Sequence, residues 1–307
     1  MGKRLFISYS HAQQPWVQRN LVPCLRAGGA EVLIDSEQFG AGKHLVGQMD
    51  SVQDSAEVSV LVLSPEYLTS LNCLHEMHRA IDRHATPGEM TIIPVKRDNC
   101  DLPAPLKALG LLYVNLSDDT QSAPWDSLLT ACGADLGVSA PQWLQARNDV
   151  ERLLLRDQSV NLVVTGHPRW RELITHLRGE PVSDLKVVDL DNGATASRPG
   201  LVEEILKTCG LPSLVPKRPK GEDLVVLQRT LASNAHAPRL ALLRFDRVQD
   251  RADAYDVNFF AALNHLVESR HLVLLIESRT PVKALIPQDR LSSFDSKLHV
   301  VELTGRP

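Results

Sequence analysis

The segment VSVLVLS, Val58–Ser64, is apolar at nearly every position, and it restricts the possible folds more than any other stretch of the chain. A strand with one face in water alternates apolar and polar side chains, whereas this one is apolar on both faces. Such strands occur in parallel sheets that helices cover on both sides. Parallel neighbours also need long crossover connections, which are usually helical. The segment therefore predicts an α/β fold.

Four more strand-like runs support this prediction in the first half of the chain: Arg4–Ser10, Ala30–Asp35, Met90–Lys96 and Leu111–Ser117. Helical patterns separate these runs. The first helix should end at Gly28-Gly29, because glycine is typical of helix ends. Strands that alternate with helices predict a doubly wound parallel sheet, in which functional sites form at the carboxyl ends of the strands.

The second half repeats the alternation, with strands expected at Val160–Gly166, Leu185–Leu190, Arg239–Phe245 and His271–Ser278. Between the two halves, the stretches SDDTQSAPW and GVSAPQW interrupt the pattern. We therefore predict a first domain over residues 1–135, a linker over 136–145 and a second α/β domain over 146–307. Two domains suit a chain of 307 residues.

The composition argues against several classes of protein. Hydrophobic residues make up 43% of the chain and charged residues 23%, and the formal net charge is −4. Nucleic-acid binding is not indicated, because no overall basic field would attract phosphates. No apolar run reaches the length of a membrane span, and the N-terminus begins a strand rather than a signal peptide, so no membrane partner is expected. Five scattered cysteines without CxxC spacing favour a reducing, cytoplasmic setting.

The stretch SPEYLTSLNCLHEMHRAI gathers Cys73, His75, Glu76 and His78 within six residues. This density suggests a metal site, but the spacing argues against one. The HExxH zinc motif needs histidines at i and i+4, and here they stand at i and i+3. On a helix the cysteine also points away from the histidine pair. We therefore expect no metal, and histidines that are solvated on an outer helix face.

The same helix, expected over Asn72–Arg83, carries one apolar stripe. Leu74, Met77 and Ile81 share this stripe, Cys73 and Ala80 extend it, and the stripe should face the sheet. Glu76 falls just beyond the edge of the stripe, so its carboxylate is expected to be half-buried at the rim of the domain. Two interpretations follow for Glu76, a functional carboxylate or an ordinary surface one.

Residues 3–135 resemble a TIR domain. The similarity lies in FISYSHAQQPWVQRNLVPCLRAGGAEVLID and in SPEYLTSLNCLHEMHRAI, which follow each other in the order of that family. The family pattern S-x-W-C-x-x-E is met by Ser70, Cys73 and Glu76, with Asn72 in place of the tryptophan. The resemblance implies a flavodoxin-like parallel sheet. It leaves two activities open, because many TIR domains cleave NAD+ at the nicotinamide–ribose bond and others only self-associate and relay signals.

If this TIR domain cleaves NAD+, the resemblance makes Glu76 the catalytic residue. It assigns substrate binding to residues at strand ends, in the loop after the second strand and at the start of the helix, namely Phe6, Ser8, Tyr9, Ser10, Asp35, Lys43, Ser70 and Cys73. Phe6 would equally suit the core, and Asp35 a turn or helix cap. Lys43 lies in GAGKH, which lacks the spacing of a phosphate-binding Walker A motif. NAD+ is then the substrate, and no cofactor is implied.

The second half resembles the P-loop ATPases of the STAND and AAA classes, with the Walker A motif lost. The strand, loop and helix in SVNLVVTGHPRWRELITHL begin as such folds do, but Arg171 and Glu172 stand where the motif needs glycine and lysine. Asp246 is followed by Arg247 where an acidic pair is expected. No ATPase activity is therefore expected. The basic clusters HPRWR and PKRPK are candidate surfaces for an anion or a partner, or simply solvated loops.

Together these features predict an NAD+ glycohydrolase that releases nicotinamide and ADP-ribose, linear or cyclised, once its TIR domains have self-associated. By analogy, such a protein serves a bacterial cell as an anti-phage or abortive-infection effector of innate immunity, and its second domain senses a trigger or a partner protein. One alternative is a non-catalytic TIR scaffold or signalling adaptor assembled through the second domain. Another is a protein whose second domain binds a signal nucleotide without hydrolysing it.

Overall fold

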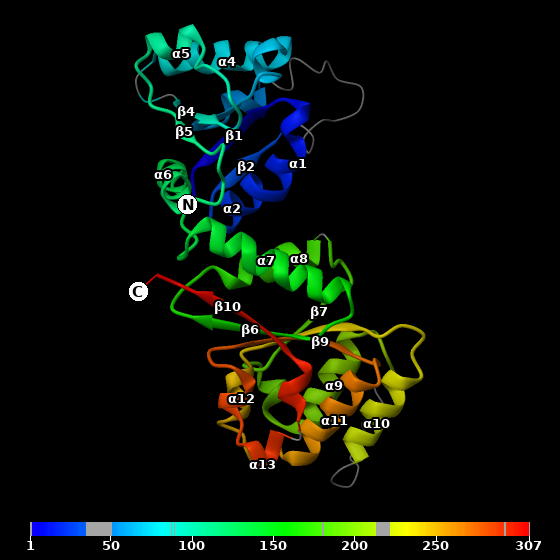
Figure 1. The fold of residues 1–307 in the computed structure, drawn as a ribbon. Helices are drawn as coiled ribbons and strands as arrows, with labels where there is room; N and C mark the ends of the chain where they lie inside the picture. The colour runs from blue at the N-terminus through cyan, green and yellow to red at the C-terminus, as the bar shows by residue number, and fades with distance from the viewer. Residues whose placement is uncertain are drawn as a thin grey trace. The chain divides into compact units, whose positions relative to one another are not determined.

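The computed structural model describes residues 2–34, 51–86, 88, 90–179, 181–212, 222–291 and 293–306. The chain divides into two compact units, Met1–Leu144 and Gln145–Pro307. Residues 140–145, part of the expected linker, lie within helix α7, Ala140–Leu155. Each unit is built around its own parallel sheet (Figure 1).

The sheet of the first unit has five parallel strands in the order β2-β1-β3-β4-β5. Their bounds are β1 Arg4–Tyr9, β2 Glu31–Leu33, β3 Val58–Leu63, β4 Thr91–Lys96 and β5 Val114–Asn115. The central strand β3 is buried at all six positions, as its apolar sequence predicts. This order is that of the flavodoxin-like doubly wound sheet, so the predicted fold class is confirmed.

Helices cover both faces of this sheet (Figure 1). Between β1 and β2 the chain forms a 3-10 turn at His11–Gln13, α1 at Gln14–Trp16, a π-helical stretch at Val17–Leu21 and α2 at Val22–Ala27. The later helices are α4 Leu71–His84, α5 Ala104–Ala108 and α6 Ser122–Ala131. The predicted stop after α2 is confirmed, because Gly29 adopts a φ of 95°, which favours glycine.

The sheet of the second unit also has five parallel strands, in the order β10-β6-β9-β8-β7. Their bounds are β6 Val160–Thr165, β7 Lys186–Asp189, β8 Arg239–Leu243, β9 Val273–Ser278 and β10 His299–Thr304. The first four are the predicted strands. The fifth, β10, is absent from the sequence prediction, because as an edge strand it exposes most of its side chains. The order places β9 between β6 and β8, so the carboxyl ends of these three strands are neighbours.

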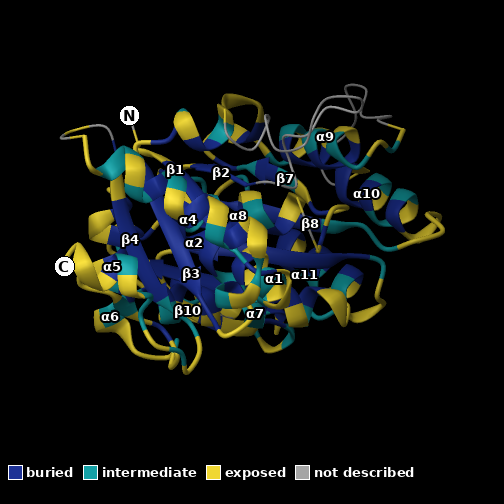
Figure 2. Ribbon diagram, turned by 90° about the horizontal axis from the view of Figure 1, so that it is seen from above, coloured by how far each residue is buried: buried dark blue, intermediate teal, exposed yellow. Residues whose placement is uncertain are grey.

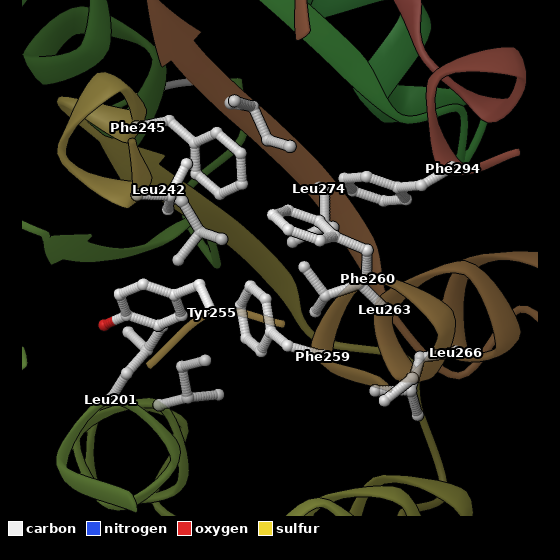
Figure 3. Packing of buried hydrophobic residues seen from close by; sticks show 14 of the residues in the cluster. Leu201, Leu242, Phe245, Tyr255, Phe259, Phe260, Leu263, Leu266, Leu274 and Phe294 are labelled. Carbon is white, nitrogen blue, oxygen red and sulfur yellow. The ribbon is translucent and has the colours of Figure 1, made fainter. Parts of the chain in front are cut away.

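The second unit has a dense core of aromatic and aliphatic side chains between its sheet and its helices. These helices are α9 Arg198–Thr208, α10 Glu222–Ala232, α11 Val257–Glu268, α12 Val282–Leu285 and α13 Gln288–Leu291, whereas α8, Trp170–Gly179, contributes no residue to this core. Phe260 lies near the centre of this core, 5.3 Å from Phe259 and 6.4 Å from Phe245 between ring centroids (Figure 3). Burial follows the sheets in both units, and the outward turns of the helices are exposed (Figure 2). Over the described ranges, no helix has the length and apolarity needed to cross a membrane.

Candidate functional site

Helix α4 starts directly after the carboxyl end of the central strand β3. A short 3-10 turn at Tyr67–Thr69 connects the two elements. Ser70 then caps the helix, because its side chain accepts a hydrogen bond from the Cys73 N–H at 3.4 Å. The first turns of α4 therefore lie at the edge of the sheet where sites form in folds of this kind.

The buried side of α4 agrees with the predicted stripe only in part. Cys73, Met77 and Ala80 are buried as predicted, whereas Leu74 and Ile81 are only partly buried at the border of the core, and Glu76 is buried as well. Glu76 is 6% exposed, so the expectation of a half-buried residue at the rim is wrong. The physical reason is that β1 provides a hydroxyl partner beneath the helix, which allows a carboxylate to occupy a central buried position.

The Glu76 carboxylate ends a chain of buried hydrogen bonds. Ser8, near the end of β1, donates its hydroxyl proton to Glu76 Oε2 at 2.5 Å. The Ser8 Oγ also lies 2.9 Å from the Tyr67 hydroxyl. A serine hydroxyl has one proton, so when Ser8 donates to Glu76 it accepts from Tyr67. This order of donors stabilises the ionised form of the carboxylate.

Two buried residues that the sequence analysis did not assign support this arrangement. Tyr67 is fully buried, and burial raises its pKa well above the ordinary value; the Ser8 hydrogen bond opposes this shift, and the nearby Glu76 adds to it. Tyr67 is therefore a neutral donor. Gln53 donates its side-chain N–H to the Glu76 carbonyl oxygen at 2.8 Å and ties α4 to the segment before β3. The sequence offered one indication of a role for Tyr67, because this residue closely follows the buried strand β3.

The structure brings together only part of the predicted site. Phe6 is fully buried in the hydrophobic core beside α4, the place expected of a core residue. Tyr9 is partly exposed at the end of β1, and the Ser10 hydroxyl lies 3.3 Å from that of Ser64. Cys73 is buried next to Glu76 on the same helix face. The remaining two predicted residues, Asp35 and Lys43, lie outside the described residues.

The two histidines of the cluster, His75 and His78, are exposed on the outer face of α4, as predicted. Within the described parts of the chain, no group of three His, Cys, Asp or Glu residues is placed to hold a metal ion. The Glu76 carboxylate therefore faces the Ser8 hydroxyl on the buried side of the helix, whereas the two histidines lie on its exposed side.

Ser70→Ala is expected to lower the free energy of unfolding of the first unit by about 1 kcal/mol, because it removes the cap of α4. Denaturant unfolding of the full chain, followed by circular dichroism, measures this loss. Ser127→Ala is the matched control, since that hydroxyl bonds back to the Ala123 carbonyl inside α6 and caps no helix. An equal loss in both variants would contradict the capping role.

In the second unit, the loop after β6 contains Gly166, which adopts a φ of 74°. Arg171 and Glu172, which replace two Walker A residues, lie in the first turns of α8. A helix start with a carboxylate in this position does not suit a bound triphosphate. The structure thus places Arg171 and Glu172 at the start of the helix that follows β6.

Comparison with known proteins gives the following similarities. A family model described as TIR domain matches residues 5–129. Toll-like receptor 6 of Bos taurus and Toll-like receptor 1 of Homo sapiens are each 32% identical to this chain over 75 residues, which is 24% of this chain. The match covers only 10% of either receptor.

Solved structures give weaker similarities. The TIR domain of the Toll-related receptor TRR-2 from Hydra magnipapillata is 19% identical with a TM-score of 0.37, and the match covers 42% of this chain and 96% of that domain. A chain in a structure of Drosophila ORC bound to DNA is 16% identical with a TM-score of 0.38, and the match covers 53% of this chain and 90% of that one.

The family match and the strand order together define the first unit as one that contains a TIR domain. The second unit is a parallel α/β domain, and its sequence contains no Walker A motif after β6. Both conclusions agree with the resemblances identified in the sequence.

Proposed function

We propose that the first unit cleaves NAD+ at the nicotinamide–ribose bond, with Glu76 as the catalytic residue. The observation that carries this proposal is the buried Glu76 carboxylate, which accepts a 2.5 Å hydrogen bond from Ser8 at the carboxyl edge of the sheet in a TIR domain. An ordinary surface carboxylate would have no reason to be buried with a dedicated donor.

The chemistry suits a single carboxylate. Nicotinamide leaves as a neutral molecule, so cleavage needs little help from a general acid. The bond breaks toward a ribosyl cation that resembles the oxocarbenium transition state of glycosidases. A negative charge held in advance at this position stabilises the developing positive charge more than it stabilises the substrate. Water or a nucleophile within the substrate then completes the reaction, which gives linear or cyclised ADP-ribose.

The direct experiment measures nicotinamide release from NAD+ by the purified full chain, by chromatography, over a wide range of protein concentrations and with a crowding agent. Release that rises steeply with protein concentration supports an enzyme activated by self-association of its TIR domains. If no assembled state releases nicotinamide, the first unit is a scaffold or signalling adaptor instead. On the enzymatic proposal, the protein is a cytoplasmic effector of antiviral defence that lowers cellular NAD+ after a trigger.

Ser8→Ala is expected to slow nicotinamide release by about 10- to 100-fold, because a hydrogen bond to a charged group contributes about 1.5–3 kcal/mol. The variant also leaves the buried Tyr67 hydroxyl without the partner seen in the structure. Tyr67→Phe is the matched comparison, since it keeps the bond between Ser8 and Glu76 and should slow release less. Equal losses in the two variants, measured as kcat and KM at one temperature, would contradict a role for Ser8 in holding the carboxylate.

A further inference from the structure

A large cavity opens in the second unit at the carboxyl ends of β6, β8 and β9. Its volume is about 940 Å³, which is within the range of sites that hold a small organic ligand. The residues that follow the three strand ends line it, among them Gly166, Arg244 and Arg279. All of the lining residues lie in the described part of the second unit.

Three acidic residues at or beside this cavity, Asp189, Asp191 and Asp250, form ion pairs with arginines. The Arg244 guanidinium donates to both oxygens of Asp189, at 2.7 and 2.5 Å, and to Asp191. Arg247 pairs with Asp191 at 2.8 Å and with Asp250 at 3.2 Å. Burial alone would raise the pKa of Asp189, but the bonds from Arg244 and from the Asp191 N–H hold it below its ordinary value. Arginine therefore occupies the place beside these carboxylates that a divalent cation would need.

Two further acidic residues that line the cavity, Asp246 and Glu277, accept hydrogen bonds from backbone N–H groups. Asp246 accepts the Arg279 N–H at 3.0 and 3.1 Å on its two oxygens. Glu277 accepts the Arg244 N–H at 2.7 Å, from a residue in the left-handed region with a φ of 54°. These contacts engage the carboxylates without using the guanidinium of Arg279.

Two guanidinium groups remain at the cavity after this pairing. Arg171 and Arg279 both line it, and Arg171 also lies close enough to Asp189 and Glu277 to interact with them electrostatically. The Arg171 guanidinium lies over the Trp170 ring, with its central carbon 5.2 Å from the ring centroid. Both arginines are exposed, and their planar forks suit the oxygens of a phosphate group. The cavity therefore combines two exposed guanidinium groups with an indole in its lining.

We propose that this cavity binds a phosphate-bearing nucleotide without a divalent metal, with Arg171 and Arg279 on the phosphates and Trp170 against the base. A free phosphate ion would fill only a small part of the cavity, whereas an indole at its edge offers a surface for a planar ring. This site lies in the second unit, and the proposal does not depend on NAD+ cleavage by the first unit.

The test is calorimetric titration of the full chain with ADP, pyrophosphate and inorganic phosphate, in EDTA and again with Mg²⁺. ADP should bind in EDTA, Mg²⁺ should not strengthen binding, and inorganic phosphate should bind at least about tenfold more weakly because it reaches fewer donors. Trp170→Leu should reduce the preference for ADP over pyrophosphate. Binding that requires Mg²⁺, or no ADP binding in EDTA, would overturn the proposal.

Arg171→Ala and Arg279→Ala should each weaken ADP binding by about tenfold or more, since each removes a charged hydrogen bond to phosphate. Arg178→Ala is the control, because this arginine is exposed in the last turn of α8 and does not line the cavity. Both test residues are exposed, so the variants should keep the melting temperature of the parent chain. Unchanged ADP affinity in both variants would place the nucleotide elsewhere and reject this site.

Discussion

Glu76→Gln is expected to reduce nicotinamide release from NAD+ by about 100- to 1000-fold, the loss typical when one preorganised electrostatic group is removed from a transition state. Glutamine has nearly the same shape and can still accept the Ser8 hydrogen bond, but it carries no negative charge to stabilise a ribosyl cation. The effect should fall on kcat more than on KM, because the charge matters most in the transition state.

The control for this variant is Glu66→Gln, which removes an exposed carboxylate from the turn before α4 and should leave the rate unchanged. Both proteins should melt near the parent temperature. If Glu76→Gln retained the full rate while folded, Glu76 would be a structural carboxylate and the catalytic assignment would fail. If the parent chain released no nicotinamide at any concentration, the scaffold interpretation would replace the enzymatic one.

Glu277→Gln is expected to stabilise the second unit at pH 8 by about 3 kcal/mol and to have little effect near pH 4. Glu277 is 4% exposed at the end of β9, and burial raises its pKa from 4.5 to about 7; the Arg244 N–H opposes this shift, and Asp246 and Asp189 add to it. A shift of about 2.5 units at about 1.36 kcal/mol per unit gives this estimate.

The sign follows from proton linkage. Below pH 4.5 the carboxyl is neutral in both the folded and the unfolded chain, so burial costs nothing extra. Between pH 4.5 and about 7 only the unfolded chain loses the proton, so the stability of the folded unit falls as pH rises. Glutamine stays neutral throughout and can still accept the Arg244 N–H, so the variant should not show this decline.

Denaturant unfolding at several pH values, fitted to the transition of the second unit, measures the difference between Glu277→Gln and the parent chain. Glu302→Gln, an exposed carboxylate on the edge strand β10, serves as the control and should show no such pH-dependent gain. A constant difference between pH 4 and pH 8 would contradict a buried carboxyl that titrates near neutrality.

The predicted strands are confirmed because their signal is local. The apolar run at Val58–Ser64 and the matching runs before and after it identify buried strands without any knowledge of their partners. β10 gives a weak signal, because an edge strand shares only one side with the sheet and exposes most of its side chains. The Leu111–Ser117 run is wider than the strand it contains, Val114–Asn115, since apolar character there extends into exposed residues such as Leu112.

The burial of Glu76 could not be predicted from periodicity. The apolar positions of α4 place Leu74 and Ile81 on the buried face, but in the structure both are only partly buried and Glu76 is buried beside Cys73. A pattern of apolar residues locates the buried face of a helix only to within about one residue position. It cannot show that another element provides a hydrogen-bond partner that allows a polar side chain to be buried.

The sequence by itself determined the alternation of strands and helices, the two halves, the loss of the Walker A residues and the candidate carboxylate, because all of these depend on residue type and spacing along the chain. Only the tertiary structure decided which groups meet. Ser8 reaches Glu76 across 68 residues, and Arg244 reaches Asp189 across 55. Such contacts arise when parallel strands bring their carboxyl ends to one edge, and no local pattern encodes which side chains then come within hydrogen-bonding distance.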